Sequence, residues 1–326
     1  MDRQLVSVET ISAIDAIPDA DMIVAAKIKG WTIVVKKDEF QVGDKCVYFE
    51  IDSMLPLQDE RFAFLASRGS KDIDGAPYHR LKTARLRGVY SQGLALPVEA
   101  FDTDNLDALG IFKYEPPALT GQGDLADVYP DRLASRTRSE RVQNLSSVWD
   151  QILAVGPWLP TEKIDGTSMS VFKTDDGRVI VCGHNYEIRD GDNIYWRAAR
   201  QYRLEDLLSP GMGIQCELYG PGIQGNPLGV KTQQVAVFSV IVDRRPVPRS
   251  EWSQEILELT SPVYDLRIPE SAELAVEQAD GIKSLVAPER NAEGIVWHNV
   301  AGEYINEIQG TSIKAISNRY LLKHEG

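Results

Sequence analysis

The N-terminal part of the chain alternates short apolar runs with turn-forming residues. The runs at residues 24–28 and 32–35 are rich in β-branched side chains and flank Lys29-Gly30-Trp31, which predicts a β-hairpin. A third strand is expected at residues 46–51. Because short strands separated by Gly and Pro are typical of a small barrel or sandwich, residues 1–110 are predicted to form a β-rich domain.

The rest of the chain mixes strand and helix periodicities. Apolar runs predict strands at 168–172, 179–181, 213–218, 235–242 and 294–297, and amphipathic stretches predict helices at 194–208, 252–259 and 270–279. Residues 111–130 lack such periodicity and are rich in Pro, Gly and Asp, which predicts a linker. The fold class is therefore predicted to be α+β, with a mixed α/β second domain over residues 131–326.

The net charge of the chain limits the kinds of partner that it can bind. The 326 residues carry a net charge of −13, so the overall field repels polyanions, and a nucleic acid must be held by local basic patches or metal ions. The basic segment at residues 79–88 is predicted to be one strand that presents Arg80, Lys82, Arg85 and Arg87. These side chains are candidate contacts to the phosphates of a nucleic acid, and the alternative is an edge strand protected by its charges.

The number of cysteines and the lack of long apolar segments predict where in the cell the protein is located. Cys46, Cys182 and Cys216 are too few and too widely spaced for a disulfide framework or a Cys-x-x-Cys zinc site. No window approaches about 18 uninterrupted apolar residues, and the N-terminus lacks an apolar signal region, so neither secretion nor membrane contact is expected. The chain is predicted to be intracellular and cytoplasmic, with a nuclear or organellar location left open.

Lys163 is the candidate nucleophile. It lies in Glu162-Lys163-Ile164-Asp165-Gly166, at the entry to a glycine-containing turn. A lysine attacks only when its amine is neutral, which requires burial or neighbouring cations that lower its pKa. Gly166 would let a ligand approach the backbone closely. Patterns this short also occur in solvated surface turns, so the motif alone does not define a function.

Four further segments follow Lys163 in order. Glu217 ends a strand at a glycine turn, Phe238 lies in the next apolar run, Glu293 precedes another run, and Lys314 lies near the C-terminus. Together with Lys163-Ile164-Asp165-Gly166, this ordered set resembles the covalent nucleotidyltransferase superfamily of ATP-dependent ligases and mRNA capping enzymes. The resemblance implies a nucleotidyltransferase domain built on antiparallel sheets over residues 131–326.

The strand-rich segment distinguishes the branches of that superfamily. Only 12 residues follow Lys314, which leaves no room for an OB domain there. Residues 31–36, 42–44 and 87–93 instead resemble the N-terminal OB domain of Deinococcus-type RNA ligases. The likeness implies an OB-type β-barrel over residues 1–110.

The resemblance implies three steps. Lys163 attacks ATP to give lysyl-AMP, AMP moves to an RNA 5′-phosphate, and a 3′-hydroxyl displaces AMP. Lys314 is implied to be the catalytic cation at the α-phosphate. Asp165, Glu217 and Glu293 are implied to hold Mg²⁺ or Mn²⁺.

The resemblance also implies a set of nucleotide contacts. Phe238 stacks on adenine and Glu162 contacts the base; the alternatives are a core phenylalanine and a solvated carboxylate. His184 replaces an arginine that these ligases usually carry, and imidazole lacks the permanent charge of guanidinium. The remaining implied contacts are Arg141, Asp165, Gly166, Glu217 and Glu293.

The implied enzyme is an ATP-dependent RNA ligase that acts as a monomer on RNA or RNA-containing duplexes with 3′-hydroxyl and 5′-phosphate ends. Two alternatives stay open. One is a non-catalytic nucleotide- or RNA-binding protein that retains the fold, and the other is an ATP-dependent DNA nick ligase.

Overall fold

The computed structural model describes residues 4–116, 119, 121–136 and 138–324, and the chain divides into two compact units. Unit 1 comprises residues 1–116 with 321–326, and unit 2 comprises residues 117–320. The segment predicted to be a linker contributes strand β12 (Phe112–Lys113), which pairs with β6 (Ser53–Pro56), and strand β13 (Leu125–Val128), which pairs with β18 (Tyr186–Ile188). The predicted domain limits stay a prediction.

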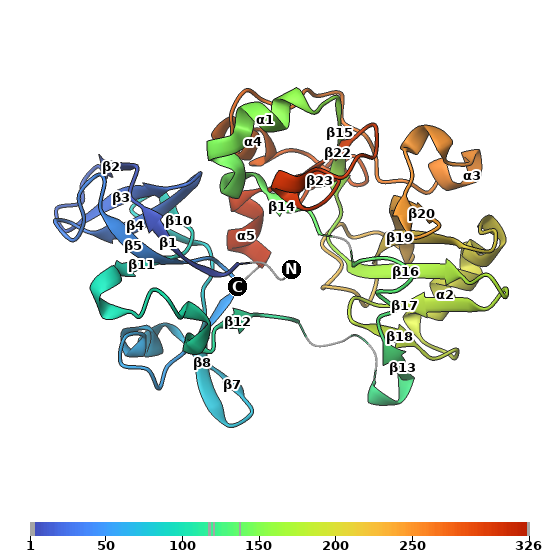
Figure 1. Cartoon of the computed structure of the whole chain (residues 1–326), viewed down its shortest axis with the longest axis horizontal. Coiled ribbons are helices and arrows are strands. Elements are labelled where there is room, and N and C mark those ends of the chain that lie inside the picture. Colours follow the sequence, from blue (N-terminus) through green and yellow to red (C-terminus); the bar gives the residue numbers. More distant parts are fainter. Residues whose placement is uncertain (1–3, 117–118, 120, 137, 325–326) are drawn as a thin grey trace. The chain divides into compact units, whose positions relative to one another are not determined.

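Unit 1 is built from short antiparallel strands (Figure 1). Besides β6 and β12, these are β1 (Val6–Thr10), β2 (Ala13–Ala16), β3 (Ile23–Ile28), β4 (Trp31–Lys36), β5 (Lys45–Phe49), β7 (Lys71–Ile73), β8 (Ala76–Arg80), β9 (Ala84–Leu86), β10 (Val89–Ser91) and β11 (Leu94–Pro97). Its 3₁₀ helices are Ala63–Arg68, Val98–Ala100 and Leu106–Leu109. The predicted hairpin is confirmed as β3–β4.

The core of unit 1 consists of fully buried aromatic residues on these strands, among them Trp31, Tyr48 and Phe49. The single basic strand expected at residues 79–88 is wrong. β8 ends at Arg80 and β9 begins at Ala84, because the intervening chain turns inward to bury Leu81, whose backbone N–H donates to the Ser53 carbonyl.

Unit 2 contains two sheets. The larger sheet has the strand order β13-β18-β17-β16-β19-β20-β21, and the smaller has the order β14-β23-β22-β15. The strands not yet bounded are β14 (Glu140–Arg141), β15 (Trp158–Lys163), β16 (Thr167–Lys173), β17 (Val179–Cys182), β19 (Met212–Tyr219), β20 (Gln234–Val242), β21 (Arg245–Pro246), β22 (Gly294–Asn299) and β23 (Ser312–Ile316). All pairs are antiparallel except β14 with β23.

Helices cover one face of each sheet of unit 2 (Figure 1). They are α1 (Trp149–Ala154) and α4 (Ala272–Ala279) on the smaller sheet, and α2 (Ile194–Gln201) and α3 (Gln254–Leu257) on the larger. Helix α5 (Asn318–His324) follows β23, and the boundary between the two units falls within it, after Tyr320. The 3₁₀ turns of unit 2 are Gln122–Asp124, Val142–Val148, Leu204–Leu207, Arg249–Glu251 and Asn306–Ile308. The helix expected at 194–208 ends at Gln201, because Arg203 takes a positive φ of 50° that a helix does not accommodate.

The smaller sheet packs one face against α1 and α4. Trp297 and Ile295 of β22 share a buried cluster with Trp149 of α1 and Ala275 of α4. Because neighbouring side chains along a strand point to opposite faces, Lys163 lies on the other face of this sheet, together with Thr161 and Val296. The helices thus leave one face of the smaller sheet to carry polar groups.

Candidate active site

Lys163 is the last residue of β15 and pairs with Gly294, the first residue of β22. This pairing brings it beside Glu293, and the Lys163 Nζ donates a hydrogen bond of 2.8 Å to Glu293 Oε2. The Lys163 side chain is 22% exposed and that of Glu293 is 12% exposed. Two predicted site residues that are far apart in sequence therefore form a partly enclosed ion pair.

Glu217 and Asp165 complete an acidic group around Lys163. Burial raises the pKa of Glu217 to about 8, against the opposing effect of Lys163, and the Gly166 backbone N–H donates to its carboxylate. Burial also raises the pKa of Glu293 to about 7, and both Lys163 and Lys314 oppose that rise. Lys163 and Asp165 thus contribute to the pKa shifts of both Glu217 and Glu293, and Lys314 contributes to that of Glu293.

The pKa of Lys163 departs from the sequence expectation. Burial lowers the pKa, but Glu293, Glu217 and Asp165 outweigh burial and hold it above its ordinary value. The amine is therefore protonated in the ligand-free site, because the nearby charges are acids rather than the cations that would depress the pKa. A nucleophilic amine requires that this acidic charge be offset when substrate binds.

Gly166 is required by the packing of its own chain. A Cβ atom at Gly166 would lie 2.3 Å from the Leu218 carbonyl oxygen, and one at Gly294 would lie 2.1 Å from the Ala315 carbonyl oxygen. Both contacts are with backbone, so a side chain at either position would force neighbouring strands apart. The space beside Gly166 is filled by protein, and its predicted contact with nucleotide stays a prediction.

Lys314 and Arg141 lie on the two strands beyond β22. Lys314 of β23 pairs with Val296, and Val296 pairs with Thr161 of β15. Because directly paired residues share a face, Lys314 lies on the same face of the smaller sheet as Lys163. Arg141 of β14 is the register partner of Lys314 and is buried. The structure thus brings two predicted cations together on this face.

A cavity of about 360 Å³ lies on the same face. It is lined by Phe238, Thr161, His298, Arg249 and Trp252, among others. The His298 Nε2 lies 3.1 Å from Thr161 Oγ1, and burial lowers the pKa of His298 to about 4, with Arg249 acting in the same direction. His298 is therefore neutral at physiological pH. Phe238 is half-buried at the cavity wall rather than enclosed in the core.

Glu162 is buried, with only 1% exposure, so it is not a solvated carboxylate. Its Oε2 accepts hydrogen bonds from the backbone N–H groups of Leu285 at 2.7 Å and Val286 at 3.2 Å. Burial raises the pKa of Glu162. Its Oε1 is also buried and has no hydrogen-bond partner among the described residues.

His184 is half-buried in the turn that joins β17 to β18. The preceding residue, Gly183, packs against Tyr195, whose hydroxyl lies 3.1 Å from Thr167 Oγ1. Thr167 begins β16, four residues after Lys163, so the His184 turn lies beside the start of that strand.

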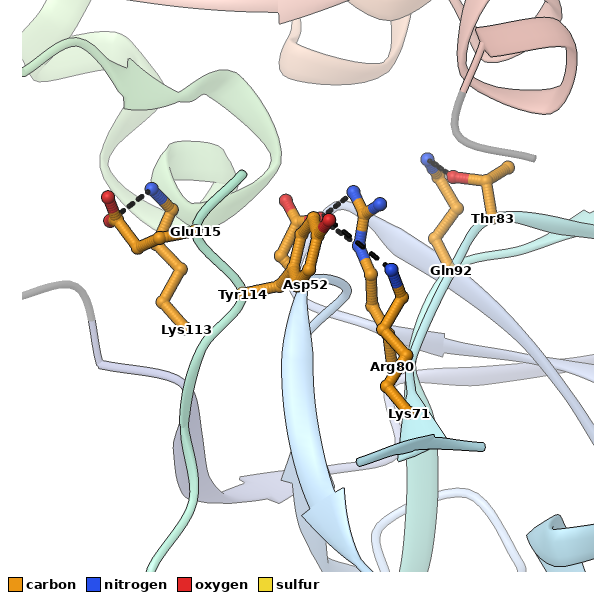
Figure 2. Close-up of polar contacts among 8 residues, drawn as sticks. All are labelled: Asp52, Lys71, Arg80, Thr83, Gln92, Lys113, Tyr114 and Glu115. Atoms are coloured by element: carbon orange, nitrogen blue, oxygen red, sulfur yellow. Dashed lines mark hydrogen bonds and ion pairs between the residues drawn. The ribbon is translucent and has the colours of Figure 1, made fainter. Parts of the chain in front are cut away.

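The four basic residues predicted in unit 1 have different surroundings. Figure 2 shows Arg80 beside Asp52 and Tyr114. Arg80 pairs with Asp52 at 2.7 Å and lies 4.2 Å from the centre of the Tyr114 ring, and Lys71 lies 4.5 Å from the centre of the same ring. The Arg80 side chain is only 16% exposed. Lys82 is half-buried, and Arg85 and Arg87 are exposed on the β9–β10 hairpin.

Two properties of the described residues bear on metals and membranes. Within residues 4–116, 119, 121–136 and 138–324, no three His, Cys, Asp or Glu side chains are placed to hold a metal ion by themselves. In that same part of the chain, every helix is too short or too polar to cross a membrane.

The thermal stability of the ligand-free protein is expected to fall between about pH 6.5 and pH 8. The folded protein retains protons on Glu293 and Glu217, whose pKa values are about 7 and about 8, whereas the unfolded chain releases them near pH 4.5. Stability falls where the unfolded state binds fewer protons. His298 has the opposite effect, but only between about pH 4 and pH 6.5. Unfolding temperatures across this range test the slope, and Glu217→Gln should flatten it; an unchanged slope would contradict the assignment.

Lys163 and Lys314 of the smaller sheet, Glu217 of the larger sheet, and Asp165 and Glu293 beside strand ends together form a nucleotidyltransferase-type site. Comparison with family models matches residues 5–98 to an OB-fold domain and residues 156–316 to RNA ligase. A comparison with curated proteins finds no match.

Solved structures of Naegleria gruberi RNA ligase resemble the whole chain. A variant with AMP and Mn is 34% identical, with a TM-score of 0.88 over 99% of both chains. The ligase with PPi is 34% identical, with a TM-score of 0.87 over 99% of both chains, and an apo variant is 34% identical, with a TM-score of 0.87 over 98% of both. The chain belongs to the RNA ligase family, with an N-terminal OB-fold domain. The predicted family, fold class and ligase activity are thereby confirmed.

Proposed function

We propose that the protein is an ATP-dependent RNA ligase that seals 3′-hydroxyl and 5′-phosphate ends in nicked RNA or RNA-containing duplexes. The observation that carries this proposal is the position of Lys163, 2.8 Å from Glu293 and within electrostatic range of Glu217 and Asp165. ATP and AMP complexes of the Naegleria ligase support ATP as the AMP donor. A non-catalytic binding protein is not favoured by this arrangement.

The chemistry takes three displacements at phosphorus. The deprotonated Lys163 amine attacks the α-phosphorus of ATP, forming an N–P bond as the bond to pyrophosphate breaks. An oxygen of the RNA 5′-phosphate then attacks that phosphorus, and Lys163 leaves as the amine. Finally a 3′-hydroxyl attacks the 5′-phosphorus, and AMP leaves. Charge on the phosphoryl oxygens is stabilised by positioned cations, and Lys314 and Arg141 lie on the face that supplies them.

A divalent ion, Mg²⁺ or Mn²⁺, fits the carboxylates of this site. Mg²⁺ usually binds through one or two carboxylates together with waters and substrate phosphates, so it needs no complete ligand set in the protein alone. Asp165, Glu217 and Glu293 would hold it. When bound, the ion offsets the acidic charge that keeps the pKa of Lys163 high and neutralises charge on the triphosphate.

The base of ATP is proposed to enter the cavity that Phe238 lines. Thr161 lies on the cavity wall two residues before Lys163, so the cavity and the nucleophile share one face of the sheet. Phe238 then stacks on adenine. Glu162 is proposed as a contact to the base. Asp165, Gly166, His184, Glu217, Glu293 and Arg141 are proposed as further nucleotide contacts.

RNA is proposed to bind the exposed arginines of the OB-fold unit, Arg85 and Arg87, with support from Lys82 and Arg80. Arg80 contributes less, because its charge is already paired with Asp52. We also propose that the enzyme acts as a monomer in the cytoplasm. The location is supported by three free, buried cysteines.

The test uses the wild-type protein with α-labelled ATP, a divalent ion and matched nicked duplexes of all-RNA, all-DNA or hybrid strands. We expect a covalent protein–AMP adduct and sealing of the RNA nick that needs both a 3′-hydroxyl and a 5′-phosphate. Sealing of the DNA nick alone would favour a DNA ligase. A labelled adduct with GTP in place of ATP would favour capping chemistry, and no adduct with either nucleotide would overturn the proposal.

Separate substitutions should divide the basic residues of unit 1 into two kinds. Arg85→Ala and Arg87→Ala should each weaken RNA binding without changing the unfolding temperature. Each should also lower the slope of log affinity against log salt concentration by about one, the effect of losing one phosphate contact. Arg80→Ala should destabilise the protein by about 1–3 kcal/mol, because it removes a largely enclosed, hydrogen-bonded ion pair with Asp52. Binding at several salt concentrations and thermal unfolding measure both effects. Equal loss of RNA binding in all three variants would contradict this division.

A further inference from the structure

Helix α5 is attached to the active site at its N-terminus. The backbone N–H of Ser317, just before the helix, donates to the Glu293 carbonyl at 2.8 Å. The Ser317 Oγ accepts from the Tyr320 backbone N–H at 3.2 Å, as a helix-capping residue does, and donates to Asp280 Oδ1 at 2.9 Å. Asp280 also accepts from the Arg319 backbone N–H at 2.9 Å. The first turn of α5 is therefore fixed beside Glu293.

Tyr320 extends from this turn to the segment that follows the nucleophile. Its hydroxyl donates to Asp165 Oδ2 at 2.6 Å, and the residue is only 7% exposed. A carboxylate only accepts hydrogen bonds, so the Tyr320 hydroxyl is the donor in this contact. A short hydrogen bond to a carboxylate is among the stronger ones in proteins.

Asp165 has no other anchor in the described structure. Its Oδ1 accepts no hydrogen bond from the described residues, and the Lys163 amine donates to Glu293 instead. Without the Tyr320 hydroxyl, the Asp165 carboxylate would be free to rotate toward the Lys163 amine. The two groups already attract each other, since Asp165 contributes to the raised pKa of Lys163. That movement would compete with the alignment of the amine for attack.

We propose that Tyr320 is a positioning residue for adenylylation: it holds Oδ2 of Asp165, so that Oδ1 remains available to the nucleotide and the carboxylate stays away from the Lys163 amine. This inference rests on the proposed function. It assigns a role to a residue that contacts neither ATP nor RNA and acts through Asp165. No motif that contains the nucleophile includes Tyr320, since it lies more than 150 residues later.

The test compares Tyr320→Phe with Tyr264→Phe, a matched control. Tyr264 is also 7% exposed in unit 2, and its hydroxyl donates to a backbone carbonyl, that of Lys283, at 2.9 Å. In single-turnover assays with α-labelled ATP, Tyr320→Phe should slow lysyl-AMP formation about tenfold at saturating ATP. Tyr264→Phe should react like the wild type. The two variants should lose similar thermal stability.

Two further measurements separate positioning from a general structural role. ATP affinity, measured by calorimetry in the Lys163→Ala background where no adduct forms, should change by less than about twofold on adding Tyr320→Phe. In an Asp165→Asn background, Tyr320→Phe should have no further effect on the rate, because the two residues act as one unit.

The inference is overturned if Tyr320→Phe reacts like the wild type, if Tyr264→Phe is equally impaired, or if the Tyr320→Phe defect persists in full beside Asp165→Asn. A large loss of ATP affinity or of folding in Tyr320→Phe alone would also overturn it. If wild-type protein forms no lysyl-AMP, the proposed function fails and this inference fails with it. If both the wild type and Tyr320→Phe form the adduct at the same rate, only the proposed role of Tyr320 is overturned, and the proposed function stands.

Discussion

Lys163→Ala is expected to abolish the covalent protein–AMP adduct, with a loss of at least about 10³-fold in sealing of RNA with ATP. The reason is chemical, because alanine has no amine to form the N–P bond. Lys314 lies two strands away across β22, whereas the end of β15 places Lys163 beside Glu293. Gel detection of labelled protein and intact-protein mass measure the adduct.

A control for folding comes from the order of the steps. The third displacement uses an adenylate already on RNA, so Lys163→Ala should still seal pre-adenylylated RNA, whereas an unfolded protein would not. Lys173→Ala removes a lysine from the far end of β16, where its amine donates to the Glu205 carbonyl at 3.5 Å, and should label like the wild type. An adduct of normal intensity in Lys163→Ala would place the nucleophile elsewhere and overturn the assignment.

The sequence predicted the parts of the structure that depend on local periodicity. The β3–β4 hairpin and the strands that carry Glu217, Phe238 and Glu293 follow from β-branched runs bounded by turn residues, and these patterns are local. The order of the motifs along the sequence predicted the protein family. Pairing of β15 with β22 then places Lys163 beside Glu293, which no local pattern predicts.

The sequence did not predict features set by contacts between distant residues. The basic strand is interrupted because Leu81 is buried, and Arg80 is withdrawn from solvent by Asp52 and Tyr114. The Lys163 pKa also depends on which charges the fold brings near, and acids outweigh burial in the ligand-free site. The role of Tyr320 could not be predicted from the sequence, because its hydrogen bond to Asp165 joins residues that only folding brings together.

Lys314→Ala is expected to slow lysyl-AMP formation by about 10²–10³-fold, the usual effect of removing one positioned group that stabilises charge in the transition state. Lys314 lies on the Lys163 face of the smaller sheet and lowers the pKa of Glu293, so its charge acts within the site. Lys323→Ala is the matched control, because Lys323 is an exposed lysine of α5 nearby in sequence. It should keep its activity. Initial rates of adduct formation measure both effects. A similar loss of rate in both variants would mean that the reaction depends on the overall positive charge of the region rather than on the position of Lys314.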